Sequence, residues 1–147
     1  MSLSASQKGF EMTTLRYSLI LNGKKAGIPE IRKAVYALRD KGYDLAVKVT
    51  WEGADMQRLI KESIIAGVDR IIIGGGDGSL NEAVTALMYL QNNYSLPEIA
   101  ALPLGTANDF ATACQIPTTI TEALNFAITG DSFPIDLISA NDRHFIN

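Results

Sequence analysis

Apolar residues along this chain follow two different spacings, one typical of buried strands and the other of amphipathic helices. Strand-like runs occupy Arg16–Leu21, Leu45–Thr50, Arg70–Ile73 and Ile99–Leu104. The third run is apolar without alternation, as expected of a parallel strand that is covered on both faces. The pattern predicts four strands, and the segments between the strands indicate how they are connected.

Helical spacing separates and follows these runs. In four segments, apolar residues recur three or four positions apart and would share one face of a helix. These residues are Ile31, Ala34, Val35 and Leu38; Met56, Leu59, Ile60 and Ile64; Leu80, Val84, Leu87 and Met88; and Ile120, Ala123, Leu124, Ala127 and Ile128. The alternation of strands and helices predicts an α/β three-layer sandwich with a mostly parallel sheet and helices on both faces.

Glycines and a capping pattern indicate where these helices end and begin. Gly42 and Gly67 should end the first two helices. Thr119 and Glu122 have the spacing of a capping box at the start of the last helix, and Gly130 should close it.

The last residues break the alternation. Pro134–Ile138 and His144–Ile146 are short strand-like runs around a polar turn, which predicts a β-hairpin. We therefore expect an α/β domain at residues 12–132, and a hairpin at residues 133–147 that leads into a C-terminal β-rich domain absent from this chain. Residues 1–11 are expected to be a leader or an artificial extension, since they lack the apolar core of a signal peptide.

Composition narrows the class of protein. The chain has 147 residues, 47% hydrophobic and 20% charged, which is typical of one globular domain. The net charge of −3 gives no electrostatic support for nucleic-acid binding. No apolar run approaches the roughly 18 residues of a membrane-spanning helix, so no transmembrane segment is expected. Cys114 is the single cysteine, which suits a reducing cytoplasm, and we expect it to be a buried structural thiol.

The most informative segment is a glycine-rich bend after the third strand, where four glycines surround Asp77 within Gly74–Asn81. Such a bend between a strand and a helix predicts a phosphate site, because glycines let the backbone approach an anion and a helix N-terminus presents free N–H groups. The bend lacks the Gly-Lys-Ser/Thr of a P-loop and the third glycine of the dinucleotide fingerprint. The alternative is a structural turn in which Ser79 and Glu82 form a capping box.

Three other polar or glycine-rich segments follow predicted strands. They are Asn22–Lys25, Thr50–Glu52 and Gly105–Asp109. Ligands of open parallel sheets bind beyond the carboxyl ends of the strands, so the fold should bring these segments and the bend to one rim.

Two motifs resemble those of a known family. Gly74–Glu82 resembles the Gly-Gly-Asp-Gly-Thr nucleotide loop of the diacylglycerol kinase catalytic-domain superfamily, and Pro103–Ala111 resembles its second motif, Pro-x-Gly-Thr-x-Asn-Asp-Phe-Ala. From about Thr14 to Asn147, the chain is similar to the N-terminal domain of bacterial YegS-type lipid kinases. Related loops occur in NAD kinases and phosphofructokinases, so the first motif alone does not select a substrate, and the second favours lipid kinases.

The resemblance implies an ATP- and Mg²⁺-dependent lipid kinase, whose nucleotide-binding domain is residues 12–132. It would transfer the γ-phosphoryl group of ATP to a hydroxyl of a diacylglycerol- or phosphatidylglycerol-like lipid at the inner membrane face. The general base and a structural metal site would lie in the absent domain, so this fragment should fold but turn over little lipid. Its exposed interface could support an artificial dimer. The alternatives are an NAD kinase-like enzyme, a non-enzymatic nucleotide-sensing module and a purely structural domain.

The resemblance also implies roles for individual residues. Backbone N–H groups of Gly75, Gly76 and Gly78 would bind phosphates. The hydroxyl of Ser79, which stands where the family usually has Thr, would also contact the nucleotide. Thr106 would do so from the second motif, and Thr50 would lie beside adenosine. The remaining expected nucleotide contacts are Leu80, Asn81, Glu82 and Asn22.

Several of these roles have alternatives. Asn22 occupies a position that many relatives follow with Pro; here Gly23 follows, which should leave that loop looser, and Asn22 could belong to a simple turn. Asp77 would hold Mg²⁺ or orient the acceptor hydroxyl, or its carboxylate would only bind backbone amides of its own turn. Asn108 and Asp109 would face the acceptor or cap the next short helix.

Four side chains outside the motifs have competing interpretations. Lys24 and Lys25 could attract ATP or be solvated surface charges. Trp51 could shelter adenine or pack at the rim, and His144, the only histidine, is expected to contribute surface packing.

Overall fold

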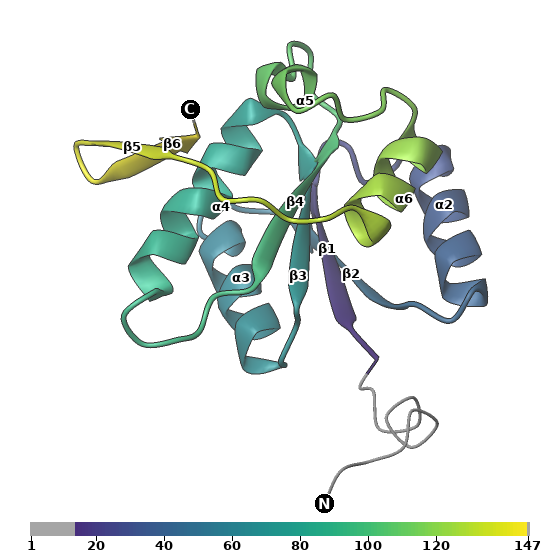
Figure 1. Ribbon diagram of the computed structural model, residues 1–147, viewed down its shortest axis with the longest axis horizontal. Coiled ribbons are helices and arrows are strands. Elements are labelled where there is room, and N and C mark those ends of the chain that lie inside the picture. The colour runs from purple at the N-terminus through teal and green to yellow at the C-terminus, as the bar shows by residue number, and fades with distance from the viewer. Residues whose placement is uncertain (1–13, 147) are drawn as a thin grey trace, which may run out of the picture.

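The computed structural model describes residues 14–146, so the expected leader at residues 1–11 lies outside the described part of the chain. Strands and helices alternate along the chain (Figure 1). The elements are β1 Arg16–Asn22, α2 Pro29–Asp40, β2 Asp44–Thr50, α3 Asp55–Ile65, β3 Arg70–Gly75, α4 Asp77–Leu90, β4 Glu98–Pro103, α5 Asp109–Ala113, α6 Ile120–Thr129, β5 Leu137–Ala140 and β6 Arg143–Ile146.

The four long strands form one parallel sheet in the order β2-β1-β3-β4. Helices α2 and α6 cover one face of the sheet and α3 and α4 cover the other, which confirms the predicted three-layer architecture (Figure 1). The two central strands are β1 and β3. The chain continues from β1 to β2 at one edge of the sheet, and from β3 to β4 at the other edge. The carboxyl ends of β1 and β3 therefore form the topological switch point, where ligands of open α/β sheets bind.

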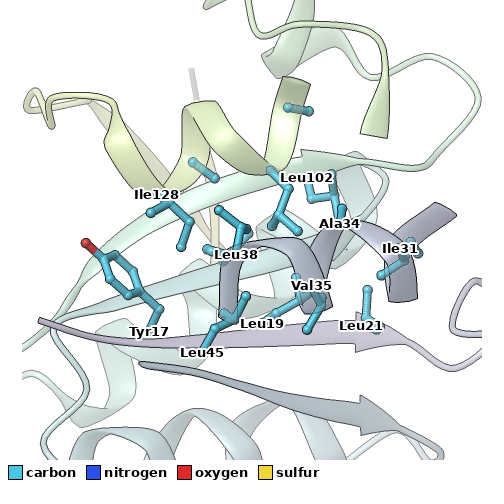
Figure 2. Packing of buried hydrophobic residues seen from close by; sticks show 14 residues of the cluster. Tyr17, Leu19, Leu21, Ile31, Ala34, Val35, Leu38, Leu45, Leu102 and Ile128 are labelled. Carbon is cyan, nitrogen blue, oxygen red and sulfur yellow. The ribbon is translucent and has the colours of Figure 1, made fainter. Parts of the chain in front are cut away.

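Apolar side chains of the central strands point into both helix layers. Ile72 of β3 packs in the cluster under α2 and α6, while Ile71 and Ile73 pack in the cluster under α3 and α4. Figure 2 shows the first cluster, in which Val35 and Leu38 of α2 lie over β1. Each fully buried side chain of this size contributes about 1.5–3 kcal/mol, so the two cores hold the sheet rigid beneath its carboxyl rim.

Most predicted helix ends are confirmed. Gly42 and Gly67 have φ angles of +99° and +78°, the left-handed conformation that glycine adopts most readily. The hydroxyl of Thr119 accepts a hydrogen bond from the Glu122 N–H at 3.3 Å, which caps α6.

The capping box predicted for Ser79 and Glu82 is wrong. Helix α4 begins at Asp77 with Gly76 at the N-cap position, so Ser79 is already the third helical residue. A capping side chain must precede the first turn, where the backbone is not yet helical. Within the described residues no side chain caps α4, and its first N–H groups are left for another acceptor.

The predicted hairpin is confirmed, although its first strand begins at Leu137 rather than Pro134. Strands β5 and β6 pair antiparallel as a separate two-stranded sheet. Asn141 and Asp142 form its two-residue turn with φ angles of +49° and +62°, as the twist of a tight hairpin requires. In residues 14–146 no helix is long and apolar enough to cross a membrane.

Candidate functional site

The predicted rim segments meet at the switch point of the sheet. The loop after β1, the bend between β3 and α4, and the loop between β4 and α5 contact one another there, and α5 lies beyond the carboxyl ends of the strands (Figure 1). We call the bend Gly74–Ser79 the first loop and Leu104–Asn108 the second loop.

The N-terminus of α4 is the most open part of the first loop. The N–H groups of Asp77, Gly78 and Ser79 stand in the first turn, where a helix has no acceptor of its own. Gly78 is exposed, and apart from its chain neighbours and the backbone of its own helix no described heavy atom lies within 4 Å of the place where its Cβ would stand. An open position thus lies beside the positive end of the helix dipole, which suits an anion.

The other glycines of the first loop are explained by packing. A Cβ on Gly75 would stand 2.5 Å from the Ser79 Oγ, and a Cβ on Gly105 would stand 2.5 Å from the Gly76 Cα. The first and second loops thus touch backbone to backbone, which only glycines permit. Gly78 differs from them, because a side chain at this position would not clash with any other described part of the protein.

Asp77 connects the two loops. Its Oδ2 accepts a hydrogen bond from the Asp109 N–H at 2.8 Å, and its Oδ1 accepts one from the Phe110 N–H at 3.3 Å. These N–H groups open α5, so the carboxylate satisfies donors that a short helix leaves unpaired. The alternative in which this carboxylate binds only amides of its own turn does not hold, because both amides belong to α5.

The loop after β1 is held more firmly than predicted. The Gly23 N–H donates to the Thr50 Oγ1 at 3.3 Å, a bond that proline could not make. The Asn22 Nδ2 donates to the Ser79 Oγ at 3.3 Å, and its Oδ1 accepts from the Lys24 N–H at 3.0 Å. The expectation of a looser loop at Gly23 is therefore wrong, because glycine lets this loop pack directly against the end of β2.

Thr50 and Ser79 are consequently engaged with the protein. The Thr50 hydroxyl also donates to the Leu21 carbonyl at 3.4 Å, and Ser79 is buried beneath Gly75. Both side chains brace the rim. Of the polar groups predicted to meet a nucleotide, Glu82 and Thr106 are exposed, and the first N–H groups of α4 have no capping side chain.

Asn108 shapes the second loop. It adopts the left-handed conformation with φ of +50°, its Oδ1 accepts from the Gly105 N–H at 3.0 Å, and its Nδ2 donates to the Gly105 carbonyl at 2.8 Å. Its side chain therefore does not cap α5, contrary to one of the two predicted roles. The side chains of Thr106 and Asp109 are exposed, and no hydrogen bond of the Thr106 hydroxyl occurs within residues 14–146.

A polar stripe on α4 that the sequence analysis missed holds the hairpin. Asn81, Thr85 and Tyr89, four residues apart, contact the main chain of the hairpin. The Asn81 Oδ1 accepts from the Ile146 N–H at 3.0 Å, the Thr85 hydroxyl accepts from the His144 N–H at 3.0 Å, and the Tyr89 hydroxyl donates to the Asp142 carbonyl at 3.5 Å. The four-residue spacing was visible in the sequence, but its partner was not. His144 is half-buried, and its main-chain carbonyl accepts a hydrogen bond from the Thr85 hydroxyl of α4. The packing predicted for His144 is therefore against α4.

The hairpin, α3 and α4 enclose a cleft of ≈ 460 Å³ that begins at Gly78. This volume is typical of small-molecule sites. Asn81 and Glu82 line it from α4, and Arg143 and His144 line it from the hairpin. The predicted nucleotide contacts at Gly78, Asn81 and Glu82 therefore share one cleft, whereas Thr50 and Thr106 do not line it.

Trp51, Lys24 and Lys25 are exposed. Trp51 is 91% exposed and therefore does not pack at the rim. A second cavity of ≈ 330 Å³ lies along the open edge of β4 and is largely apolar. It is lined in part by Cys114, whose thiol was expected to be buried but is only half-buried; its partial burial raises the pKa of the thiol.

The described residues do not form a metal site by themselves. Within residues 14–146 no three His, Cys, Asp or Glu side chains gather where they could share an ion. Mg²⁺ commonly takes only one or two carboxylates and completes its shell with water and substrate phosphates. Asp77 fits such a minor share, although both of its oxygens already accept hydrogen bonds.

Comparison with known proteins gives consistent matches. Residues 16–140 match the diacylglycerol kinase catalytic domain. The chain is 58% identical over 129 residues to a probable lipid kinase YegS-like of Shewanella frigidimarina, covering 88% of this chain and 42% of that protein. It is 51% identical over 130 residues to a probable lipid kinase YegS-like of Yersinia enterocolitica, of which it covers 44%.

Solved structures agree with the sequence matches. A crystal structure of a diacylglycerol kinase from Bacillus anthracis superposes with a TM-score of 0.77 at 28% identity, covering 92% of this chain and 47% of the other. A second structure, of a putative diacylglycerol kinase from the same organism, gives the same score and identity and is covered to 48%. The chain thus spans less than half the length of these relatives.

Proposed function

Because the chain belongs to the diacylglycerol kinase catalytic-domain family, we propose that it is the nucleotide-binding part of an ATP-dependent lipid kinase. The transferred γ-phosphoryl group would pass to a hydroxyl of a diacylglycerol- or phosphatidylglycerol-like lipid. The relatives named as lipid kinases and as a diacylglycerol kinase support a lipid acceptor, and the identity of that lipid is part of the proposal.

The open N-terminus of α4 carries this proposal. The phosphates of ATP bind to the N–H groups of Asp77, Gly78 and Ser79, and the nucleoside extends into the cleft past Glu82. Phosphoryl transfer depends mainly on positioning and charge stabilisation, and backbone N–H groups at a helix N-terminus supply both. Thr106 adds a hydroxyl from the second loop. Asn22 and Thr50 act indirectly, since their side chains hold the loop beside Ser79.

Mg²⁺ is held chiefly by the phosphates of ATP and by water in this proposal. The ion would neutralise charge on the transferred group. The absence of a ready-made carboxylate cluster in residues 14–146 agrees with an ion that arrives with the nucleotide.

The acceptor side is the less complete half of the proposal. Asp109 is exposed at the start of α5 and would face the lipid, while Asn108 would contribute by shaping the second loop. The general base belongs to the rest of the protein, which acts as a cytoplasmic enzyme at the inner membrane face. Dimerisation of this domain, if observed, would use the surface that the other domain covers.

Titration calorimetry with Mg·ATP tests the nucleotide half of this proposal on the present chain. We expect binding, and its absence would contradict the proposal. For the acceptor, the whole protein should be assayed with dioctanoylglycerol, phosphatidylglycerol and NAD. Phosphorylation of a lipid supports the proposal, whereas phosphorylation of NAD alone supports a soluble acceptor. ATP binding without any transfer indicates a nucleotide-sensing module.

A further inference from the structure

We propose that Asp77 is a positioning residue, whose carboxylate fixes the second loop against the first so that Thr106 stands beside the N-terminus of α4. This inference rests on the proposed nucleotide site and adds to it a role for Asp77 that does not require contact with a metal ion or with the acceptor.

The orientation of Asp77 supports this role. It is the first residue of α4, so its main-chain N–H belongs to the helix terminus, while its carboxylate binds the start of α5, directly after the second loop. The two oxygens accept from the N–H groups of Asp109 and Phe110 at 2.8 and 3.3 Å. Hydrogen bonds to an ionised carboxylate are roughly twice as strong as neutral ones. Asp77 therefore belongs to the proposed anion site through its backbone, and its side chain holds the start of α5, where the second loop ends.

The second loop has few other attachments to the first. The Leu104 N–H donates to the Gly75 carbonyl at 2.8 Å at the end of the sheet, and Gly105 lies against Gly76. Beyond Gly105, the side-chain bonds of Asn108 stay within the loop, and its carbonyl accepts from Thr112 of α5 rather than from the first loop. Asp77 is thus the polar link between the first loop and the start of α5. Thr106 lies between this link and the contact at Gly105, so both ends of its segment are held.

A direct role at the metal makes different predictions from a positioning role. A metal ligand affects nucleotide binding only when the metal is present, and it need not affect the backbone of α5. A positioning residue affects the dynamics of α5 without any ligand, and it affects nucleotide binding with or without Mg²⁺. The substitution Asp77→Asn separates the two, since an amide keeps the shape but can accept through only one of its two atoms.

The first measurement is amide hydrogen exchange on the nucleotide-free chain. Asp77→Asn should speed exchange at the Asp109 and Phe110 amides by about tenfold, the effect of losing one hydrogen bond to a charged group. Asp69→Asn is the matched control, because the Asp69 Oδ2 also accepts a main-chain N–H, from Arg16 at 2.7 Å, but at the amino ends of β1 and β3. The control should leave both α5 amides unchanged, and unchanged exchange in Asp77→Asn would overturn the inference.

The second measurement is ADP affinity in EDTA and in Mg²⁺. Asp77→Asn should weaken binding by a similar factor in both, about fivefold or more, whereas Asp69→Asn should not weaken it. In a double-mutant cycle, Thr106→Ala should cost less affinity in the Asp77→Asn background than alone, since a displaced loop no longer presents the hydroxyl.

These measurements distinguish the inference from the proposed function. A loss of affinity seen only with Mg²⁺, or full additivity with Thr106→Ala, overturns the positioning role while leaving the nucleotide site intact. Failure of the unsubstituted chain to bind ADP and ATP contradicts both. Should Asp77→Asn not fold, Asp77→Glu keeps the charge and displaces the carboxylate, and the same two measurements apply, with faster exchange at Phe110 expected.

Discussion

Gly78 gives the clearest separation of binding from folding, and we expect Gly78→Val to abolish tight nucleotide binding in a chain that still folds. Its position is exposed, and outside its chain neighbours and the backbone of α4 no described heavy atom lies within 4 Å of the added Cβ. Surface substitutions that disturb nothing usually change the free energy of unfolding by about 0.5 kcal/mol or less. A phosphate at the α4 N-terminus, in contrast, would meet the new side chain.

The size of the binding defect follows from the contacts that are lost. A hydrogen bond to a charged group is worth about 1.5–3 kcal/mol. Displacing the phosphate from even one N–H group therefore weakens ATP binding by about tenfold or more. Gly105→Ala should behave in the opposite manner: its Cβ would stand 2.5 Å from the Gly76 Cα, and we expect a loss of stability of about 1–3 kcal/mol.

Urea unfolding and calorimetry with Mg·ATP measure the two effects on the same samples. Gly27→Val is a suitable control, since Gly27 has no described neighbour within 4 Å of its Cβ and lies outside the first loop. The reasoning is refuted if Gly78→Val binds ATP as tightly as the unsubstituted chain, because the free space at Gly78 then has no part in phosphate binding.

Two further predictions concern the segments beside the site. The Asp55 carboxylate accepts hydrogen bonds from the Glu52 and Trp51 N–H groups and from Arg58, which lower its pKa below the ordinary value of 3.8. Its stabilising effect is therefore present above pH 3.8 and lost as the pH falls through the lower folded pKa. Urea unfolding in acid should show a smaller loss of the free energy of unfolding for Asp55→Asn than for the unsubstituted chain. Thr85→Val removes the hydroxyl that binds the His144 main chain. The His144 amide should therefore exchange about tenfold faster, while amide exchange in β1 and β3 stays unchanged. Equal exchange at His144 in the variant and the unsubstituted chain would show that Thr85 does not hold the hairpin.

The fold was predictable because its elements follow the spacing of apolar residues closely. The run at residues 71–73 lacks alternation because both faces of β3 are buried. The strand order could not be read from spacing, since it depends on which neighbours pair. The alternative capping box at Ser79 and Glu82 has the right spacing but the wrong place, because α4 begins at Asp77 and both residues lie inside the helix.

The sequence predicted which segments form the site better than it predicted what each side chain does there. The parallel topology brings Asn22, Asp77 and Gly105 to one rim, as the sequence indicates. Most of their side chains bind one another or the main chain, because buried and half-buried polar groups must find partners when loops pack this closely. Asn81 and Thr85 hold the hairpin for the same reason, and no local pattern reveals a partner so far along the chain.

The central claim is that backbone N–H groups at the start of α4 bind the phosphates of a nucleotide. Amide chemical shifts of the ¹⁵N-labelled chain during titration with Mg·ATP test it most directly. We predict that the largest changes occur at Asp77, Gly78 and Ser79, followed by Thr106. Saturable changes confined to the opposite edge of the sheet, or no change at these amides while ATP binds elsewhere, would contradict the account.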